Sequence, residues 1–323
     1  MVHRVSIPRD GNRPPAPGYA GPVIWDDNRI VPAPPVAPYV IAEIGCNHGG
    51  DLELAKRMIS VAARFCEVDA VKFQKRDPAT LLTPEQYEAP HPEPRNAFGA
   101  SYGEHREFLE FDIDQHAELA ACAAEHGVVY STSVWDMPSA KAVVALAPRF
   151  VKVPSATNQH TELLELLCAE FGGIIHLSLG MTTRAEEERI VALFRERGRL
   201  ADLVLYACTS GYPVPFEDVC LLEVQRLREA YGADVHAVGF SGHHLGIAAD
   251  VAALALGAQY VERHFTLDRT SKGTDHAASL EPDGMRKLAR DLRNVAKALT
   301  YKPSDVLPIE ETQREKLKWR TSR

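Results

Sequence analysis

The sequence predicts an α/β fold, a (β/α)8 (TIM) barrel preceded by a proline-rich N-terminal extension. Short apolar runs of strand length alternate with amphipathic stretches of helix length from residue 39 to residue 300. Eight such runs occur, and a helical pattern follows each of them. The length of 323 residues fits two ordinary domains, or one barrel of about 250 residues with a remainder. The eight repeats favour the single barrel.

The first segment, residues 1–38, is too rich in proline for regular structure. It holds nine of the 22 prolines, and proline cannot donate a backbone hydrogen bond. We therefore expect an extended arm with one short hairpin around Val23–Val31.

The eight predicted strands are rich in β-branched and aromatic residues, which is typical of buried parallel strands. They span residues 39–44, 70–74, 128–133, 150–155, 174–179, 203–208, 236–241 and 259–265. The predicted barrel helices span residues 52–65, 115–126, 140–147, 162–171, 184–197, 219–231, 246–256 and 282–299. Thr183 and Glu186 have the spacing of a capping box, and Asp51 can cap the first barrel helix.

One connection, from Lys75 to Glu110, is too long for a simple loop between a strand and a helix. It follows the second strand, on the face where barrels carry their active sites, so we expect a lid or a binding loop. Residues 301–323 form a short charged tail. The predicted domains are therefore the arm at 1–38, the catalytic barrel at 39–300 and the tail at 301–323.

Composition argues against several classes of protein. The net charge of −8 gives no basic field for nucleic acid. No apolar run approaches the roughly 20 residues that span a bilayer, and the N-terminus has no apolar signal segment. The six cysteines form no C-x-x-C pair, which favours reduced thiols. We expect a cytoplasmic protein that binds neither nucleic acid nor membrane.

Polar residues gather at the ends of the predicted strands, where a barrel carries its chemistry. They are Glu43, Lys72, Gln74, Thr132, Lys152, Ser155, Ser178, Ser241, His243 and His264, with Tyr212 and Asp275 in the loops that follow. Two lysines and several hydroxyls can hold a phosphate or a carboxylate through charge-assisted hydrogen bonds. Two histidines on adjacent strands are a natural start for a divalent metal site.

Each of these residues also has a purely structural explanation. Lys72 or Lys152 can belong to a buried ion pair, and His244 can be a bystander. A hydroxyl at a strand end can satisfy local backbone groups, and Tyr212 before a proline can shape a turn. The joint occurrence of the whole set at one end of a barrel favours a binding site.

Several motifs resemble the sialic acid synthase (N-acetylneuraminate synthase) family. They are IAEIGCNHGGD at 41–51, DAVKFQ at 69–74, KVPS at 152–155, SLGM at 178–181, CTSGYP at 208–213, ERHFTLD at 262–268 and GTDHAASLEP at 273–282. The likeness extends over residues 39–300, nearly the whole predicted barrel.

The resemblance implies a metal-dependent condensation of phosphoenolpyruvate with an aldose, giving a 3-deoxy-2-ulosonic (sialic-acid-like) acid and phosphate. It makes the protein a carbon–carbon bond-forming transferase of nonulosonic acid biosynthesis, with Mn²⁺ or Mg²⁺ as cofactor and other divalent ions not excluded. The implied metal ligands are His243 and His264. The implied phosphoenolpyruvate contacts are Lys72, Thr132, Lys152, Ser155, Ser178 and Ser241. Glu43, Lys72, Lys152 and His264 are implied as catalytic, and Tyr212, Asp275 and Gln74 as acceptor contacts.

The sequence departs from the family pattern in its acceptor-binding features. Thr157 stands where many relatives have a glutamate that contacts an acylamino sugar. Gly242 replaces the aspartate of Ser-Asp-His, and Ala207 replaces a histidine. Little sequence follows Leu299, so we expect no counterpart of the C-terminal antifreeze-like domain here. We therefore expect an acceptor other than plain N-acetylmannosamine, and the oligomeric state stays open, with a homodimer as the family's usual arrangement.

Three other functions fit the sequence less well. A Schiff-base pyruvate aldolase would use Lys72 or Lys152 but would leave both histidines without a role. A metal-dependent amidohydrolase is disfavoured because the first strand does not end in a His-x-His pair. A non-catalytic barrel that acts as a binding or scaffold protein is disfavoured because both lysines and both histidines are present.

Overall fold

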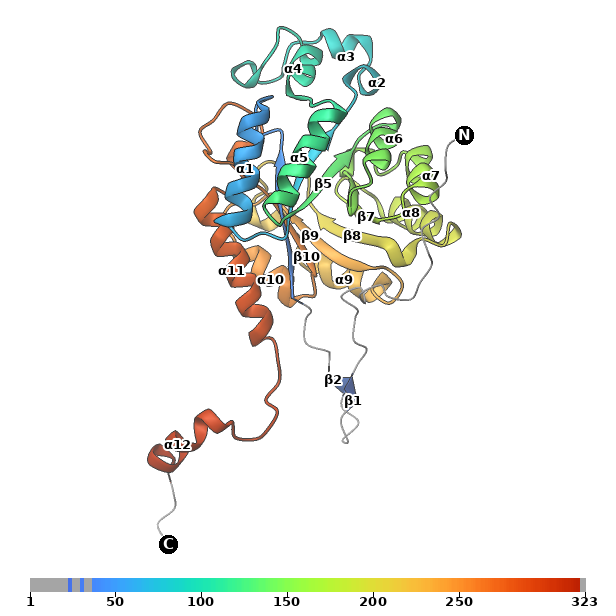
Figure 1. The fold of residues 1–323 in the computed structure, drawn as a ribbon. Coiled ribbons are helices and arrows are strands. Elements are labelled where there is room, and N and C mark those ends of the chain that lie inside the picture. The colour runs from blue at the N-terminus through green and yellow to red at the C-terminus, as the bar shows by residue number, and fades with distance from the viewer. Residues whose placement is uncertain (1–22, 25–29, 32–36, 320–323) are drawn as a thin grey trace.

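The computed structural model describes residues 23–24, 30–31 and 37–319. Their centre is a closed barrel of eight parallel strands in the order β10-β3-β4-β5-β6-β7-β8-β9, with helices packed around it (Figure 1). The predicted (β/α)8 barrel is therefore confirmed. The strands are β3 (Tyr39–Gly45), β4 (Ala70–Lys75), β5 (Val129–Val134), β6 (Phe150–Val153), β7 (Ile174–Ser178), β8 (Leu203–Cys208), β9 (Ala237–Gly242) and β10 (Tyr260–His264).

Eight longer helices cover the outside of the barrel in the part of the chain that the structure describes. They are α1 (Leu52–Arg64), α5 (Ile113–Glu125), α6 (Met137–Leu146), α7 (Thr161–Glu170), α8 (Arg184–Glu196), α9 (Leu222–Tyr231), α10 (Ala248–Ala255) and α11 (Pro282–Ala298). Asp51 caps α1 by accepting the Leu54 N–H at 3.0 Å. Thr183 and Glu186 form the predicted capping box at the start of α8.

The strands divide the core into an outer layer, between the strands and the helices, and an inner layer inside the barrel. Strand residues such as Val71 and Leu205 face outward and pack against the helices, because side chains alternate between the two faces of a strand. The inner face is apolar at one end of the barrel, around Ile41, Val204 and Tyr206. Gly239 lies against this layer, where a Cβ atom would come within 2.6 Å of the Tyr206 ring. Farther along the same strands the inner face becomes charged.

The connection from Lys75 to Glu110 is not a simple loop. It contains α2 (Pro78–Leu81), α3 (Pro84–Glu88), the 3-10 turn η1 (Pro94–Asn96) and α4 (Tyr102–Leu109). Figure 1 shows these helices together beyond one end of the barrel. We call the whole connection, residues 76–110, the insert. Sequence periodicity missed its helices because helices of four to eight residues carry too few turns to show a pattern.

The ends of the chain carry small elements of their own. β1 (Val23–Ile24) and β2 (Ile30–Val31) pair antiparallel, as the predicted hairpin requires, and the rest of residues 1–36 lies outside the described residues. The tail contains an unpredicted helix, α12 (Pro308–Leu317), which stands away from the barrel (Figure 1). Within the described part of the chain, every helix is too short or too polar to cross a membrane.

Candidate functional site

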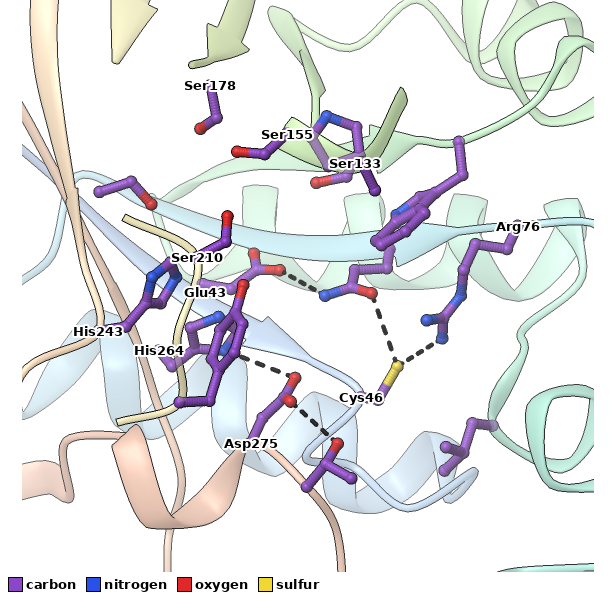
Figure 2. A pocket seen from close by; sticks show the side chains of 18 of the residues that line it. Glu43, Cys46, Arg76, Ser133, Ser155, Ser178, Ser210, His243, His264 and Asp275 are labelled. Atoms are coloured by element: carbon purple, nitrogen blue, oxygen red, sulfur yellow. Dashed lines mark hydrogen bonds and ion pairs between the residues drawn. The ribbon is translucent and has the colours of Figure 1, made fainter. Parts of the chain in front are cut away.

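A cavity of about 490 Å³ opens at the carboxyl ends of the barrel strands. Each of the eight strands contributes a lining side chain: Glu43, Lys72, Ser133, Lys152, Ser178, Cys208, Ser241 and Glu262. The insert, the loop that holds Asp275 and the loops after β5, β6, β7 and β8 form most of the rest of the wall. Figure 2 shows side chains from these elements pointing into one space.

The floor of the cavity is a chain of four buried charges. Lys72 Nζ lies 2.5 Å from Glu43 Oε2 and 3.8 Å from Glu262 Oε2. Lys152 Nζ lies 2.5 Å from Glu262 Oε1. Each of these side chains is at most 5% exposed, so each charge depends on its neighbours for stabilisation. Both lysines thus do belong to buried ion pairs, and the same ammonium groups face the cavity.

The two carboxylates of this chain differ in their proton affinity. Burial raises the pKa of Glu43 from 4.5 to about 7, against the pull of Lys72. Burial would also raise the pKa of Glu262, but Lys152 and Lys72 outweigh it and hold that pKa far below its usual range. Glu262 therefore stays ionised, whereas Glu43 can take up and release a proton near neutral pH.

A second group of polar atoms consists of serine hydroxyls near Gly180. Ser155 Oγ accepts the Gly180 N–H at 3.0 Å. A Cβ atom on Gly180 would lie 2.4 Å from Ser210 Oγ and 2.7 Å from Ser155 Oγ, so only glycine fits beneath them. Ser178 Oγ and Ser210 Oγ are buried and have no hydrogen-bond partner among the described residues. Unpartnered buried hydroxyls at a cavity wall are free to bind a ligand.

Two histidines face each other at the mouth of the cavity, with ring centroids 5.3 Å apart. His243 Nδ1 lies 2.9 Å from the Thr209 carbonyl oxygen, so it carries a hydrogen and donates to that oxygen. Burial lowers the pKa of His243, but the neighbouring Cys208 outweighs it and raises that pKa. Burial and the neighbouring His243 lower the pKa of His264 to about 4, which keeps its imidazole neutral. His264 Nδ1 lies 3.7 Å from Asp275 Oδ2, and Tyr212 packs against both rings (Figure 2 labels the histidines and Asp275).

Comparison with known proteins places this geometry in a family. The profile of the NeuB family matches residues 58–303. Human N-acetylneuraminate-9-phosphate synthase is 38% identical over 279 residues, which cover 86% of this chain and 76% of that protein. N,N'-diacetyllegionaminic acid synthase of Campylobacter jejuni is 35% identical, over 80% of this chain and 77% of that protein.

The chain belongs to the NeuB family. A solved structure agrees in fold: N-acetylneuraminic acid (sialic acid) synthetase from Leptospira borgpetersenii, determined in complex with citrate, superposes with a TM-score of 0.73 at 27% identity. The match covers 88% of this chain and 93% of that one. The resemblance found in the sequence motifs is thereby confirmed.

The barrel brings together nearly all residues predicted for a NeuB-type site. Those that line the cavity are Glu43, Lys72, Gln74, Lys152, Ser155, Ser178, Tyr212, Ser241, His243, His264 and Asp275. Gln74 donates to Glu43 Oε1 at 3.1 Å, and Ser241 donates to Glu262 Oε1 at 3.2 Å. His244, in contrast, is buried behind the wall within 3.2 Å of Asp250 and Arg263, which makes it structural.

The predicted role of Thr132 as a phosphoenolpyruvate contact needs correction. It lies on β5 opposite Phe73 and Val151, two residues of the outer apolar layer, and does not line the cavity. Its neighbour Ser133 points inward and accepts a hydrogen bond from Lys72 Nζ at 2.8 Å. Because side chains alternate along a strand, an error of one residue moves the assignment to the opposite face.

Other lining residues were missed by the sequence analysis. Glu262 lies two residues before His264 on β10, and this period-two spacing is a signal that both face inward. Ser210 follows Thr209 in the loop after β8. The insert contributes four more lining residues, Arg76, His91, His105 and Arg106. The motifs quoted above do not include the insert, so they give no signal for these residues.

Proposed function

We propose that the protein condenses phosphoenolpyruvate with an aldose to give a 3-deoxy-2-ulosonic acid and inorganic phosphate. The observation that carries this proposal is the pair of unpartnered buried hydroxyls, Ser178 and Ser210, in the same cavity as the ammonium groups of Lys72 and Lys152. Donors of this kind, removed from water, match an anion with several acceptor oxygens. The family relatives named above are synthases of nine-carbon acids of this class.

Phosphoenolpyruvate needs donors for a phosphate and a carboxylate. We assign the phosphate to Lys152 and to the hydroxyls of Ser155, Ser178 and Ser210, which lie around Gly180 on one wall. We assign the carboxylate to Lys72 with Ser133 and Ser241, which reach the floor from neighbouring strands. Glu43 and Glu262 keep both lysines in place before the substrate arrives.

A divalent metal, Mn²⁺ or Mg²⁺, belongs to this proposal. Over the described residues, no three His, Cys, Asp or Glu side chains converge closely enough to hold a metal ion by themselves. His243 and His264 nevertheless suit such an ion, since the Thr209 carbonyl orients the His243 ring through Nδ1 and the unpartnered His264 Nδ1 belongs to a neutral ring. With water and substrate in the remaining positions, the ion would polarise the aldehyde of the acceptor.

The protein's own groups manage the remaining chemistry. C3 of the enol ester attacks the aldehyde carbon, the aldehyde oxygen takes a proton from solvent water, and positive charge develops at C2. Glu43 and Glu262 stabilise that charge electrostatically. Ionised Glu43 then accepts a proton from the water that adds to C2, a role that suits a carboxylate with a pKa near 7. The C2–O bond to phosphate breaks last: the C2 hydroxyl becomes the ketone, its proton leaves with the phosphate, and Lys152 and the serines hold the departing phosphate.

The acceptor lies on the opposite side of the floor, beside Tyr212, Asp275 and Gln74. We propose that it is an aldose other than plain N-acetylmannosamine, because Thr157 offers no carboxylate and does not line the cavity. A phosphate-release assay tests the proposal: the protein and phosphoenolpyruvate are mixed with a panel of aldoses, with Mn²⁺ and with a chelator. We expect release that needs both an aldose and the metal. No release with any aldose would favour the non-catalytic barrel.

A further inference from the structure

The outer wall of the cavity carries polar side chains that the proposed chemistry leaves without a role. They come from the insert, and they are His91, His105 and Arg106, close to the aromatic ring of Tyr102. His91 is 7% exposed and His105 is 3% exposed, so these are buried groups that line the cavity. Their ring centroids lie 4.4 Å apart.

Both histidines have their tautomer fixed by the backbone. His91 Nδ1 accepts the Glu93 N–H at 2.9 Å, and His105 Nδ1 accepts the Phe98 N–H at 3.2 Å. A ring nitrogen that accepts an N–H bond carries no hydrogen, so the hydrogen of each neutral ring lies on Nε2. Neither Nε2 has a hydrogen-bond partner within the described residues. Each ring therefore offers one N–H donor and no acceptor to the cavity.

Arg106 adds an unneutralised positive charge to this wall. Its guanidinium lies 4.9 Å above the Tyr102 ring, and its Nε donates to Tyr102 Oη at 2.9 Å. Among the described residues, no carboxylate oxygen lies within 4.0 Å of Arg106, whereas Arg76 is bound to Glu110 at 2.5 Å. Glu104 and Glu107, the acidic residues nearest to Arg106 in sequence, are exposed, and the cavity-lining Glu93 is exposed and pairs with Arg95 at 3.3 Å.

The charge balance of the cavity supports the same conclusion. On the floor, two lysines face two glutamates. On the insert wall the lining carboxylate is that of Glu93, which is exposed and paired with Arg95, whereas His91, His105 and Arg106 present donors. Burial lowers the pKa of His105 to about 4, and His91 and then Arg106 add to this effect. A neutral sugar hydroxyl gains little from such a wall, because a hydroxyl is also a donor that needs an acceptor. An anionic group with several acceptor oxygens satisfies all three residues.

The geometry points to a second anion site, in which His91, His105 and Arg106 bind a phosphate ester at the far end of the acceptor. The substrate class of the proposed condensation is then a phosphorylated aldose. Phosphoenolpyruvate supplies C1 to C3 of the product, so C9 of a nine-carbon acid is C6 of a six-carbon acceptor. The human relative is named for a 9-phosphate product, which corresponds to an acceptor 6-phosphate. This inference rests on the proposed function.

Steady-state kinetics with N-acetylmannosamine and with its 6-phosphate test the inference. We expect the wild-type protein to use the 6-phosphate with a kcat/KM at least about tenfold higher. Arg106→Gln removes the charge. His105→Asn keeps an acceptor for the Phe98 N–H but removes the Nε2 donor. Both variants should raise KM for the 6-phosphate about tenfold or more and leave KM for phosphoenolpyruvate unchanged. Arg57→Gln, an exposed arginine on α1, is the matched control.

The outcomes separate this inference from the proposed function. Equal kcat/KM for the two sugars, or an equal loss for both in Arg106→Gln, would overturn the phosphate site. If neither sugar releases phosphate, the proposed function fails for these acceptors, and calorimetric titration of N-acetylmannosamine 6-phosphate decides the site alone. Binding that weakens in Arg106→Gln and His105→Asn supports it. Absent binding, or binding that the variants leave unchanged, contradicts it.

Discussion

Lys152 Nζ lies 2.5 Å from Glu262 Oε1, and both side chains are buried at the bottom of the cavity. Glu262 also lies 3.8 Å from Lys72 and accepts a hydrogen bond from Ser241. One carboxylate thus interacts with two ammonium groups that come from different strands, and Glu43 supplies the second negative charge. The pair joins β6 to β10 across the inside of the barrel, so it serves both the fold and the orientation of the lysines.

Glu262→Gln should therefore reduce stability and activity together. Loss of the carboxylate leaves two buried ammonium groups with too little compensation, which costs about 3–5 kcal/mol when a buried pair is broken. Denaturant unfolding should show this loss in the free energy of unfolding, and KM for phosphoenolpyruvate should rise. Asp234→Asn, which removes a surface pair with Arg195, should change stability by less than about 1 kcal/mol. An equally small effect for Glu262→Gln would contradict the role given to this pair.

Glu43 should control the acid limb of the pH–rate profile. Its pKa is about 7, so kcat/KM should rise with pH up to about that value as the carboxylate forms. Glu43→Gln should lower kcat by about 10²–10⁴ and remove this limb. A limb near pH 7 that persists in the variant would belong to another group and would refute the assignment.

The same group makes stability depend on pH. The folded pKa of Glu43 lies above the reference value of 4.5, so the folded state binds the proton more tightly than the unfolded state. The resulting stabilisation is fully present below about pH 4.5 and is lost as pH rises through about 7. Unfolding curves of the wild type and Glu43→Gln across this range should differ in slope.

Strands and barrel helices were predictable because their signals are local. Every predicted strand end lies within two residues of the observed one, since buried parallel strands are continuous apolar runs. The insert was not predictable in this way. Its helices α2 to α4 are short, and capping residues such as Ser101 and Thr83, rather than an apolar stripe, define them.

Site residues were predictable only where the sequence shows which side chains of a strand face the inside of the barrel. Glu43, Lys72 and Lys152 are charged residues inside apolar runs, and burying a charged side chain without a partner costs folding free energy. The choice between Thr132 and Ser133 had no such signal, because both carry a hydroxyl and the register of β5 depends on its neighbours. The pairing of Lys152 with Glu262 requires the closed barrel, since 110 residues separate them.

The serine cluster should determine affinity for phosphoenolpyruvate. Ser178→Ala and Ser210→Ala each remove one buried hydroxyl that has no partner in the protein, so stability should change little. A hydrogen bond to a charged phosphate is worth about 1.5–3 kcal/mol, so KM for phosphoenolpyruvate should rise roughly tenfold or more in each variant. Ser271→Ala, at an exposed loop position, is the control. Unchanged KM in both cluster variants would place the phosphate elsewhere.

Removal of the metal should abolish phosphate release, and added Mn²⁺ should restore it. The two histidines can be tested by a direct binding measurement, in which the paramagnetic signal of free Mn²⁺ is followed as protein is added. His243→Gln and His264→Gln should each weaken Mn²⁺ binding by at least about tenfold, because only two imidazoles are available and each then carries much of the affinity. His126→Gln, which lies at the end of α5 away from the cavity, should bind as the wild type does. Wild-type binding in both cavity variants would move the metal to other ligands and leave the histidines to the acceptor sugar.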